Sequence, residues 1–266
     1  MTDVPYEDQK KKEKTMHRIH LVRHGLSESN LSTEVNKRKP DHAIELAPEG
    51  HEQAKQAGQF LGKHIQEGVP GFHRRRVLML VSPYLRTRQT ADGVEDGIRR
   101  QGLEYVRREQ ISLREQSFGL FDGYSENELP KVYPREYAHY EKHARFEGMD
   151  DRLKGEFFAP MPMGESRARV CDRVRTSFGT IHRAMDDGYS DIVVVSHGVT
   201  IRCFAREWKH LPWEWCENEP NPANCSILTL EGARDCNWKM ERIFDGFEHP
   251  KDPAHQQQEH REEGHV

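Results

Sequence analysis

The chain has 266 residues, 35% of them hydrophobic and 32% charged, which suits one large domain or two small ones and leaves enough apolar residues for a core. Forty Lys and Arg residues against 44 Asp and Glu residues leave a formal charge of −4, so no global basic field exists to hold nucleic acid or an anionic membrane surface. No run approaches the ~20 apolar residues of a membrane span and the N-terminus lacks a signal-peptide pattern, so we expect a cytoplasmic protein without a membrane span.

The two ends of the chain differ from its middle in composition. Residues 1–15 are charged and nearly free of aliphatic side chains, and residues 247–266 combine Gln, Glu, His and Pro without apolar periodicity. We therefore predict disordered tails at both ends and one folded domain over residues 16–246.

Three short aliphatic runs, 18–22, 77–81 and 191–195, are typical of strands buried on both faces. Segments of helical character follow them, most clearly 48–64, which starts with Pro and Glu and carries an apolar stripe. This alternation predicts an α/β fold, a single mostly parallel central sheet with helices on both faces. Two late runs, 226–230 and 237–244, are predicted to add edge strands.

Residues 124–160 depart from this rhythm because they are rich in Tyr, Phe, Glu, Lys and Arg. We interpret them as a mostly helical insertion that caps a site, with its aromatic residues forming the core of the cap. A box at 164–166, Gly-Glu-Ser, precedes another helical stretch and fits an N-cap, so Glu165 is interpreted as structural first.

Two His-Gly pairs follow two of the predicted core strands. His24 and Gly25 come directly after the first strand, and His197 and Gly198 directly after the third. Parallel α/β sheets bind ligands beyond the carboxyl ends of their strands, so both histidines are expected at one solvent-facing edge. One such pair would be an ordinary turn, but two at equivalent positions indicate a site.

The second strand is followed by Ser-Pro-Tyr-Leu-Arg-Thr-Arg, residues 82–88. Pro83 fits the first turn of a helix and places Arg86 near its N-terminus. Backbone N–H groups and a guanidinium together form an anion site, whereas Arg88 is the better candidate for a solvated surface charge.

The histidines and cysteines do not show the spacing of a metal centre. The sequence has 16 histidines without an HxH or HExxH pattern, and its five cysteines show no CxxC spacing. We therefore expect no metal and no disulfide framework, and interpret the cysteines as reduced thiols.

Five ordered boxes resemble the histidine phosphatase superfamily in its phosphoglycerate mutase-like branch. They read LVRHGLSESN, SPYLRTRQTA, LREQSFGLFDG, MGESRARV and VVVSHG between about residues 17 and 245. A DHAIEL stretch at 41–46 and Asn-Pro-Ala-Asn at 221–224 are similar to plant and fungal members of that branch. The resemblance implies a phosphoglycerate mutase-like fold.

The resemblance also implies roles for individual residues. His24 would be the nucleophile that is phosphorylated on a ring nitrogen, and Glu115 the general acid and base. The phosphoryl group would lie among the remaining catalytic residues Arg23, Arg86 and His197, with His197 acting as a cationic donor, and among the binding residues Asn30, Ser27 and Gly198. A ring of cations and N–H donors is what phosphoryl transfer needs, because charge develops on the equatorial oxygens.

The activity expected from this resemblance is hydrolysis of phosphate monoesters on a phosphorylated small molecule, without a cofactor. The first alternative is a phosphoglycerate mutase that uses 2,3-bisphosphoglycerate, and the second is a phosphate-binding regulatory protein with little turnover. Phe118 stands where the mutases have Tyr, and Leu26-Ser27 where they have Glu-Ser, which favours the hydrolase. A homodimer is compatible with the sequence.

Overall fold

The computed structural model describes residues 15–68, 74–144, 155–233 and 237–248. A six-stranded sheet in the order β3-β2-β4-β1-β5-β6 runs through its centre. The first four of these strands are parallel to one another, β5 is antiparallel to β1, and β6 is antiparallel to β5. The strands are β1 (His17–Arg23), β2 (Arg76–Val81), β3 (Glu104–Glu109), β4 (Asp191–Ser196), β5 (Ile227–Gly232) and β6 (Lys239–Phe244). The mostly parallel sheet is confirmed, and both late runs form strands. Only β6 lies at the edge, because β5 pairs with β1 on one side and with β6 on the other.

The edge strand β3 was not predicted. Its sequence, EYVRRE, contains two apolar residues, and only Tyr105 and Arg107 are partly covered. The strand pairs with β2 alone, so it needs little apolar surface. Arg107 lies against α3 instead, where it forms ion pairs with Asp92 and Glu95.

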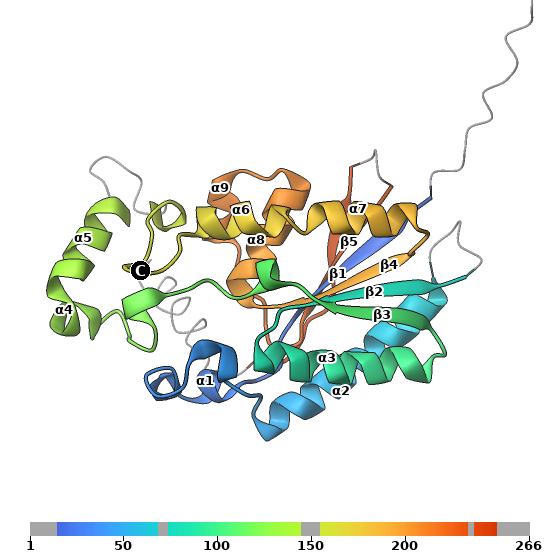
Figure 1. Cartoon of the computed structure of the whole chain (residues 1–266), viewed down its shortest axis with the longest axis horizontal. Coiled ribbons are helices and arrows are strands. Elements are labelled where there is room, and N and C mark those ends of the chain that lie inside the picture. The colour runs from blue at the N-terminus through green and yellow to red at the C-terminus, as the bar shows by residue number, and fades with distance from the viewer. Residues whose placement is uncertain (1–14, 69–73, 145–154, 234–236, 249–266) are drawn as a thin grey trace, which may run out of the picture.

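Helices cover both faces of the sheet, as predicted (Figure 1). One face carries α2 (Pro48–Glu67) and α3 (Leu85–Arg100). The other carries α6 (Arg167–Arg175), α7 (Phe178–Asp186), α8 (Gly198–Lys209) and α9 (Trp213–Asn218). Alternate strand residues point to the two faces, so that Ile192 and Val194 lie in one core and Val193 and Val195 in the other.

The insertion forms a separate small lobe at one end of the molecule (Figure 1). It contains α4 (Leu129–Val132) and α5 (Pro134–Ala144), and its residues 145–154 lie outside the described part of the chain. Phe121, Leu129 and Tyr140 form its core, with Tyr133 and Tyr137 packed against them. The predicted aromatic core is therefore confirmed for these tyrosines. It is wrong for Phe157, which packs in the main core, and for Phe158, which is 57% exposed.

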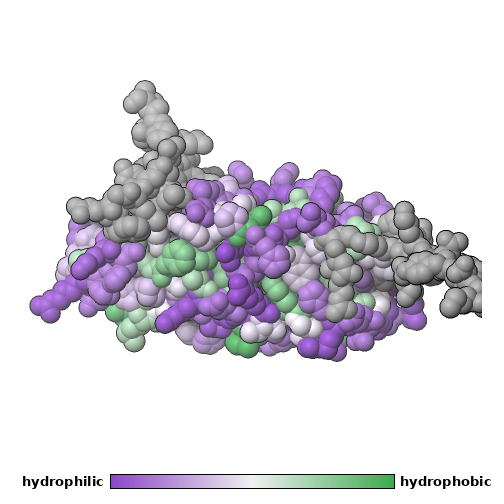
Figure 2. All heavy atoms as spheres, turned by 90° about the horizontal axis from the view of Figure 1, so that it is seen from above, coloured by the Kyte–Doolittle hydropathy of each residue, from purple (hydrophilic) through white to green (hydrophobic). Residues whose placement is uncertain are grey.

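Most of both predicted tails lies outside the described residues, but the boundary at residue 246 is one residue short. Phe247 donates its backbone N–H to the carbonyl of Asn224 at 2.8 Å, and its ring packs against Phe244. Helix α1, the first in the described residues, is a single turn (Glu28–Leu31). Within the described ranges, no helix combines the length and hydrophobicity needed to span a membrane. Figure 2 shows one face of the molecule, on which hydrophilic residues predominate around smaller hydrophobic areas.

Candidate active site

The two predicted His-Gly turns lie side by side because β1 and β4 are neighbours in the sheet. Arg23 pairs with Ser196 in register, and the backbone N–H of His24 donates to the carbonyl of Ser196 at 3.0 Å. The ring centroids of His24 and His197 are 5.3 Å apart. Both residues are buried, with 4% and 0% exposed, so the expectation of a solvent-facing position was wrong.

His24 is held as a neutral ring with one defined free nitrogen. Its Nδ1 lies 2.8 Å from the carbonyl oxygen of Gly25. Because a carbonyl only accepts, Nδ1 carries the proton and Nε2 keeps its lone pair. Burial, followed by the nearby charges of Arg86 and Arg23, holds the pKa of His24 well below its ordinary value. This shift favours the neutral form of the ring, which is the form that a nucleophile requires.

His197 is held through the other nitrogen. Its Nε2 lies 2.8 Å from the hydroxyl of Ser82, and its Nδ1 is buried without a hydrogen-bond partner among the described residues. Burial lowers the pKa of this ring well below the ordinary value, and Arg86 and His24 lower it further. The expected cationic His197 is thus not the state that the folded protein favours by itself.

Arg23 and Arg86 place two guanidinium groups beside these rings, and both residues are 4% exposed. Arg23 donates to the carbonyl of Pro222 at 2.5 Å. Arg86 donates from Nη1 to the carbonyl of Asp41 at 2.6 Å and to its carboxylate at 2.8 Å. Its Nε is buried without a hydrogen-bond partner in the described part of the chain, so this group can still bind an anion.

The helix that carries Arg86 begins later than predicted. Tyr84 is the N-cap of α3 and Leu85 its first residue, so Pro83 precedes the helix. Arg86 is the second residue of the helix and remains in its first turn. Arg88 is about half exposed and pairs with Glu109 at 3.1 Å, which agrees with its interpretation as a surface charge.

Glu115 lies beside the N-terminus of α8. Its Oε1 accepts from the backbone N–H and the hydroxyl of Thr200, at 3.3 and 3.1 Å, and from the backbone N–H of Gln116 at 2.9 Å. All three donors reach the same carboxyl oxygen, and the side chain belongs to a residue that is 9% exposed. These bonds leave the second oxygen, Oε2, without a hydrogen-bond donor among those described for Glu115.

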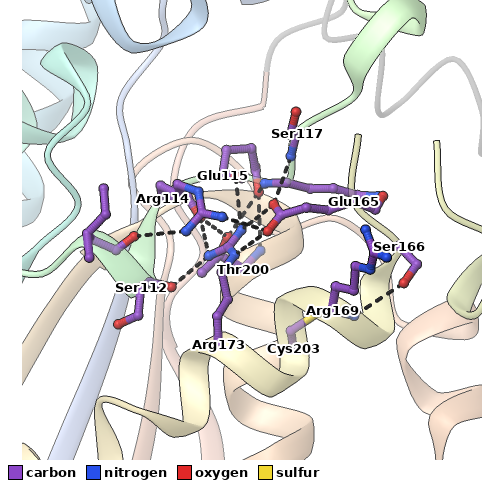
Figure 3. A network of polar contacts seen from close by, with 12 residues as sticks. Ser112, Arg114, Glu115, Ser117, Glu165, Ser166, Arg169, Arg173, Thr200 and Cys203 are labelled. Carbon is purple, nitrogen blue, oxygen red and sulfur yellow. Dashed lines mark hydrogen bonds and ion pairs between the residues drawn. The ribbon is translucent and has the colours of Figure 1, made fainter. Parts of the chain in front are cut away.

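An arginine of α6 fixes the loop that carries Glu115 (Figure 3). Arg173 donates to the backbone carbonyls of Ser112, Arg114 and Glu115 at 2.6 to 2.9 Å. It also pairs with Glu165 at 3.0 Å, and Glu165 accepts from Arg114 at 2.7 Å. The contacts of Glu165 are therefore structural, as interpreted, and Ser166 caps α6 by accepting from Arg169. Arg173 is a positioning residue that the sequence did not indicate.

The loop after β1 is held by its own side chains. Ser27 is the N-cap of α1, and its hydroxyl donates to Oδ1 of Asn30 at 2.9 Å. The same oxygen accepts from the backbone of Ser27 and from Asn224. The hydroxyl of Ser27 is thus used within the loop, where it orients the side chain of Asn30. Because the carbonyl side of the Asn30 amide is taken, its NH₂ group is the end that can face a ligand.

The segment 221–224, noted in the sequence for its likeness to plant and fungal proteins, braces this loop. Asn224 donates to the carbonyl of His24 at 3.1 Å, and the carbonyl of Pro222 accepts from Arg23. Gly198 permits the close approach of the segment, because a Cβ at that position would lie 2.1 Å from Oδ1 of Asn221. Gly25 is required for a similar reason, since its Cβ would lie 2.5 Å from the carbonyl oxygen of Gly50.

The base of the insertion is tied to the loop that follows α1. Asn36 donates to Asp122 at 2.8 Å, and Lys37 pairs with Glu128 at 3.2 Å. Burial raises the pKa of Asp122, as does the charge of Asp41, the partner of Arg86. A second carboxyl group therefore lies near the guanidinium of Arg86, at the root of the cap.

The structure brings together possible metal ligands that the sequence spacing did not indicate. In the described ranges, three or more His, Cys, Asp or Glu side chains converge at ligand distance in one place, and no histidine takes part. That place holds Cys171, Cys203 and Cys216, which are too far apart in sequence for any spacing motif to reveal. It does not include the residues around His24.

A family model of the histidine phosphatase superfamily (branch 1) matches residues 19–246. The chain belongs to the histidine phosphatase superfamily. The match covers the sheet, the helices on both faces and every residue of the candidate site. Histidine phosphatase membership supports enzyme activity, and the predicted resemblance is confirmed.

Two curated relatives are similar over most of the chain. The phosphoglycerate mutase-like protein AT74 of Arabidopsis thaliana is 36% identical over 222 residues, which are 80% of this chain and 64% of that protein. The chain therefore spans less than two thirds of AT74. The broad-range acid phosphatase DET1 of Saccharomyces cerevisiae is 27% identical over 285 aligned positions, covering 80% of this chain and 84% of that protein.

Solved structures of histidine phosphatases share the fold. A mycobacterial glucosyl-3-phosphoglycerate phosphatase complexed with VO3 superimposes with a TM-score of 0.61 at 22% identity, over 87% of this chain and all of that one. At this identity the likeness shows the fold alone. It confirms the predicted phosphoglycerate mutase-like architecture.

Proposed function

We propose that this protein hydrolyses phosphate monoesters through a phosphohistidine intermediate on Nε2 of His24. The observation that carries the proposal is the bond from Nδ1 of His24 to the carbonyl of Gly25, which leaves Nε2 with its lone pair in a buried, cation-lined position. A neutral imidazole there attacks phosphorus, and the covalent intermediate divides one difficult displacement into two easier ones.

The cations and donors around His24 match the needs of the transferred group. Arg23 and Arg86 supply guanidinium groups, and Nε of Arg86 is a buried donor still to be satisfied. Nδ1 of His197 is a second unsatisfied nitrogen, and an entering phosphoryl dianion would raise the pKa of this ring and favour its protonated form. Phosphoryl transfer depends mainly on such fixed charge stabilisation.

Glu115 supplies the proton that the leaving alcohol needs. In the first step the Nε2–P bond forms, the P–O ester bond breaks, and the protonated carboxyl gives its proton to the leaving oxygen. In the second step Glu115 takes a proton from water, which attacks phosphorus and breaks the N–P bond. The donors on Oε1 fix the carboxyl group and leave Oε2 to carry the proton.

The lowered pKa of His24 supports an acid-type phosphatase. A histidine with an ordinary pKa of about 6.5 is mostly protonated in mildly acidic solution and has lost its nucleophilic lone pair. Burial and two arginines lower the pKa of His24 and so oppose this protonation. The similarity to a broad-range acid phosphatase supports the same assignment. The proposed hydrolysis uses water and no cofactor.

The test is rapid-quench detection of the phosphoenzyme, with p-nitrophenyl phosphate as substrate from mildly acidic to neutral pH. The quench is alkaline and denaturing because phosphohistidine is labile in acid, and mass spectrometry locates the phosphate. A transient phosphate on His24 with release of inorganic phosphate is expected. The exposed His51 offers a matched control, since His51→Ala should keep the phosphoenzyme that His24→Ala loses.

A parallel sample with 3-phosphoglycerate and 2,3-bisphosphoglycerate separates the alternatives. A persistent phosphoenzyme that yields 2-phosphoglycerate would make the protein a mutase and overturn the hydrolase. Absence of phosphoenzyme and turnover with a panel of phosphate esters, together with phosphate binding, would make it a phosphate-binding protein.

A further inference from the structure

Three cysteine side chains from three helices meet in the core above the sheet. Cys171 lies on α6, Cys203 on α8 and Cys216 on α9, and these helices pack together in Figure 1. Their Sγ atoms all lie within 4.8 Å of one another. The three residues are 2%, 0% and 1% exposed. None of them takes part in the proposed phosphatase chemistry.

The spacing of the sulfur atoms suits a central ion. Three sulfurs that each lie about 2.3 Å from one ion in a plane are about 4 Å from each other. The upper limit of 4.8 Å on the separations of the Cys171, Cys203 and Cys216 sulfurs exceeds this spacing by less than about 1 Å. In the described part of the chain, no histidine, carboxylate or fourth cysteine joins the group at this distance.

A partly buried positive charge lies next to the cluster. Arg202 precedes Cys203 on α8, and its Nη1 donates to the carbonyl of Cys216 and to that of Glu219, both at 3.0 Å. Its Nε is buried without a hydrogen-bond partner among the described residues. A complex of three thiolates with a monovalent cation carries a charge of −2, which this guanidinium offsets in part.

We propose that Cys171, Cys203 and Cys216 bind one soft closed-shell cation, with Cu(I) as the best fit, in a trigonal thiolate site. Thiolates select soft cations over Mg²⁺, Ca²⁺ and Mn²⁺. Structural Zn²⁺ takes four protein ligands, whereas three sulfurs complete a trigonal Cu(I) site. On binding, three S–H bonds are replaced by three Cu–S bonds, the protons leave to solvent, and the metal keeps its oxidation state.

Binding would join α9 to α6 and α8. Helix α9 has only six residues, and Cys216 is one of its two buried residues. Three bonds to one ion would therefore cross-link α9 to two longer helices, in addition to the packing of Trp213 and Trp215 against the core. Because the folded protein presents the three thiols together and the unfolded chain does not, the ion should stabilise the folded state.

The first experiment titrates the reduced full-length protein anaerobically with Cu(I), in competition with the chromophoric chelator bathocuproine disulfonate. One Cu(I) per chain is expected, together with a rise in melting temperature. Cys203→Ser should weaken the binding by more than the about 10–100-fold typical of changes outside the ligand shell. Cys225→Ser is the matched control, because Cys225 is also buried but lies outside the cluster, and it should bind as the original protein does.

X-ray absorption of the Cu(I)-loaded original protein tests the site without a variant that could fail to fold. Three sulfur neighbours around copper are expected. Two sulfurs or fewer, a stoichiometry below one per chain, or equal binding by Cys203→Ser would overturn the proposal.

Discussion

The turn after β1 and the turn after β4 begin with the same His-Gly pair, but the structure holds the two rings by opposite nitrogens. Nδ1 of His24 donates to the carbonyl of its own neighbour Gly25. His197 is held at Nε2 by Ser82, which follows β2. The first ring therefore offers Nε2 to the site and the second offers Nδ1.

This difference shows how one dipeptide can serve two roles. A backbone carbonyl can only accept, so it fixes the protonation of His24. A hydroxyl can donate or accept, so Ser82 allows His197 to lose or gain a proton at Nδ1. The first turn suits a nucleophile, and the second suits a donor that responds to the charge of the bound group.

Replacement of each histidine in turn should separate these two roles, and these replacements should give the largest losses of turnover. His24→Ala should lower turnover by on the order of 10⁴-fold or more, the scale seen when a nucleophile is removed, and should abolish the phosphoenzyme. His197→Ala should slow phosphoryl transfer but leave a detectable phosphate on His24. Rapid-quench mass spectrometry measures both. A phosphoenzyme in His24→Ala, or full activity, would sink the assigned mechanism.

Glu115 is linked to the second turn by its bonds to Thr200. The loss of turnover on replacing Glu115 should depend on the leaving group of the substrate. Glu115→Gln should lower turnover by about 10²–10⁴-fold for alkyl phosphates, since their leaving groups need a proton. The loss should be smaller for p-nitrophenyl phosphate, whose leaving group departs unprotonated. Steady-state kinetics with a series of leaving groups measures this. Equal losses across the series would show that Glu115 is structural.

Arg86 acts on both turns, because its charge lowers the pKa of His24 and that of His197. Arg86→Ala should lower kcat by about 10²–10³-fold through loss of a charged donor to the phosphoryl oxygens. It should also raise the pKa of both rings, which nuclear magnetic resonance titration can follow. Arg88→Ala, on the same helix and ion-paired at the surface, is the control and should be near neutral. A stronger effect of Arg88→Ala would transfer the role to that residue.

Ser82→Ala should affect the second turn alone. Loss of the hydrogen bond to Nε2 of His197 costs about 1.4 kcal/mol, or about tenfold in turnover. Formation of the phosphoenzyme should slow, whereas Nε2 of His24 should keep its reactivity toward small phosphoramidates. Pre-steady-state kinetics resolves the two steps. If the loss of turnover in the double variant equalled the sum of the losses in Ser82→Ala and His197→Ala, expressed as free energies, the two residues would not act together.

Acid should destabilise the fold through the same two rings. Since their folded-state pKa values lie below that of the unfolded chain, the unfolded chain binds more protons as the pH falls below about 6.5. The free energy of unfolding should then fall by up to about 1.4 kcal/mol per pH unit for each ring. Urea denaturation of the original protein and of His197→Gln at several pH values measures the slope. An unchanged slope in the variant would show that His197 is not the source.

Many features of the protein could be predicted from the sequence because they are local. The aliphatic runs of β1, β2 and β4 need burial on both faces whatever surrounds them, and Pro48 suits the start of α2. The His-Gly turns and Arg86 follow strand ends, where parallel sheets place ligands. By contrast, β3 escaped prediction because an edge strand next to a helix can be built largely from charged residues.

The tertiary structure decided what depends on residues distant in sequence. The side chains of Ser82, Arg173 and Asn224 are ordinary in sequence, and only the packing of strand ends places them on His197, the Glu115 loop and the His24 carbonyl. The same is true of the three cysteines, which have no motif spacing. Residue identities and strand order thus determined which groups reach the sheet edge. Folding determined their protonation and partners, because pKa values and hydrogen bonds depend on burial and on atoms that only the folded chain brings within a few ångströms.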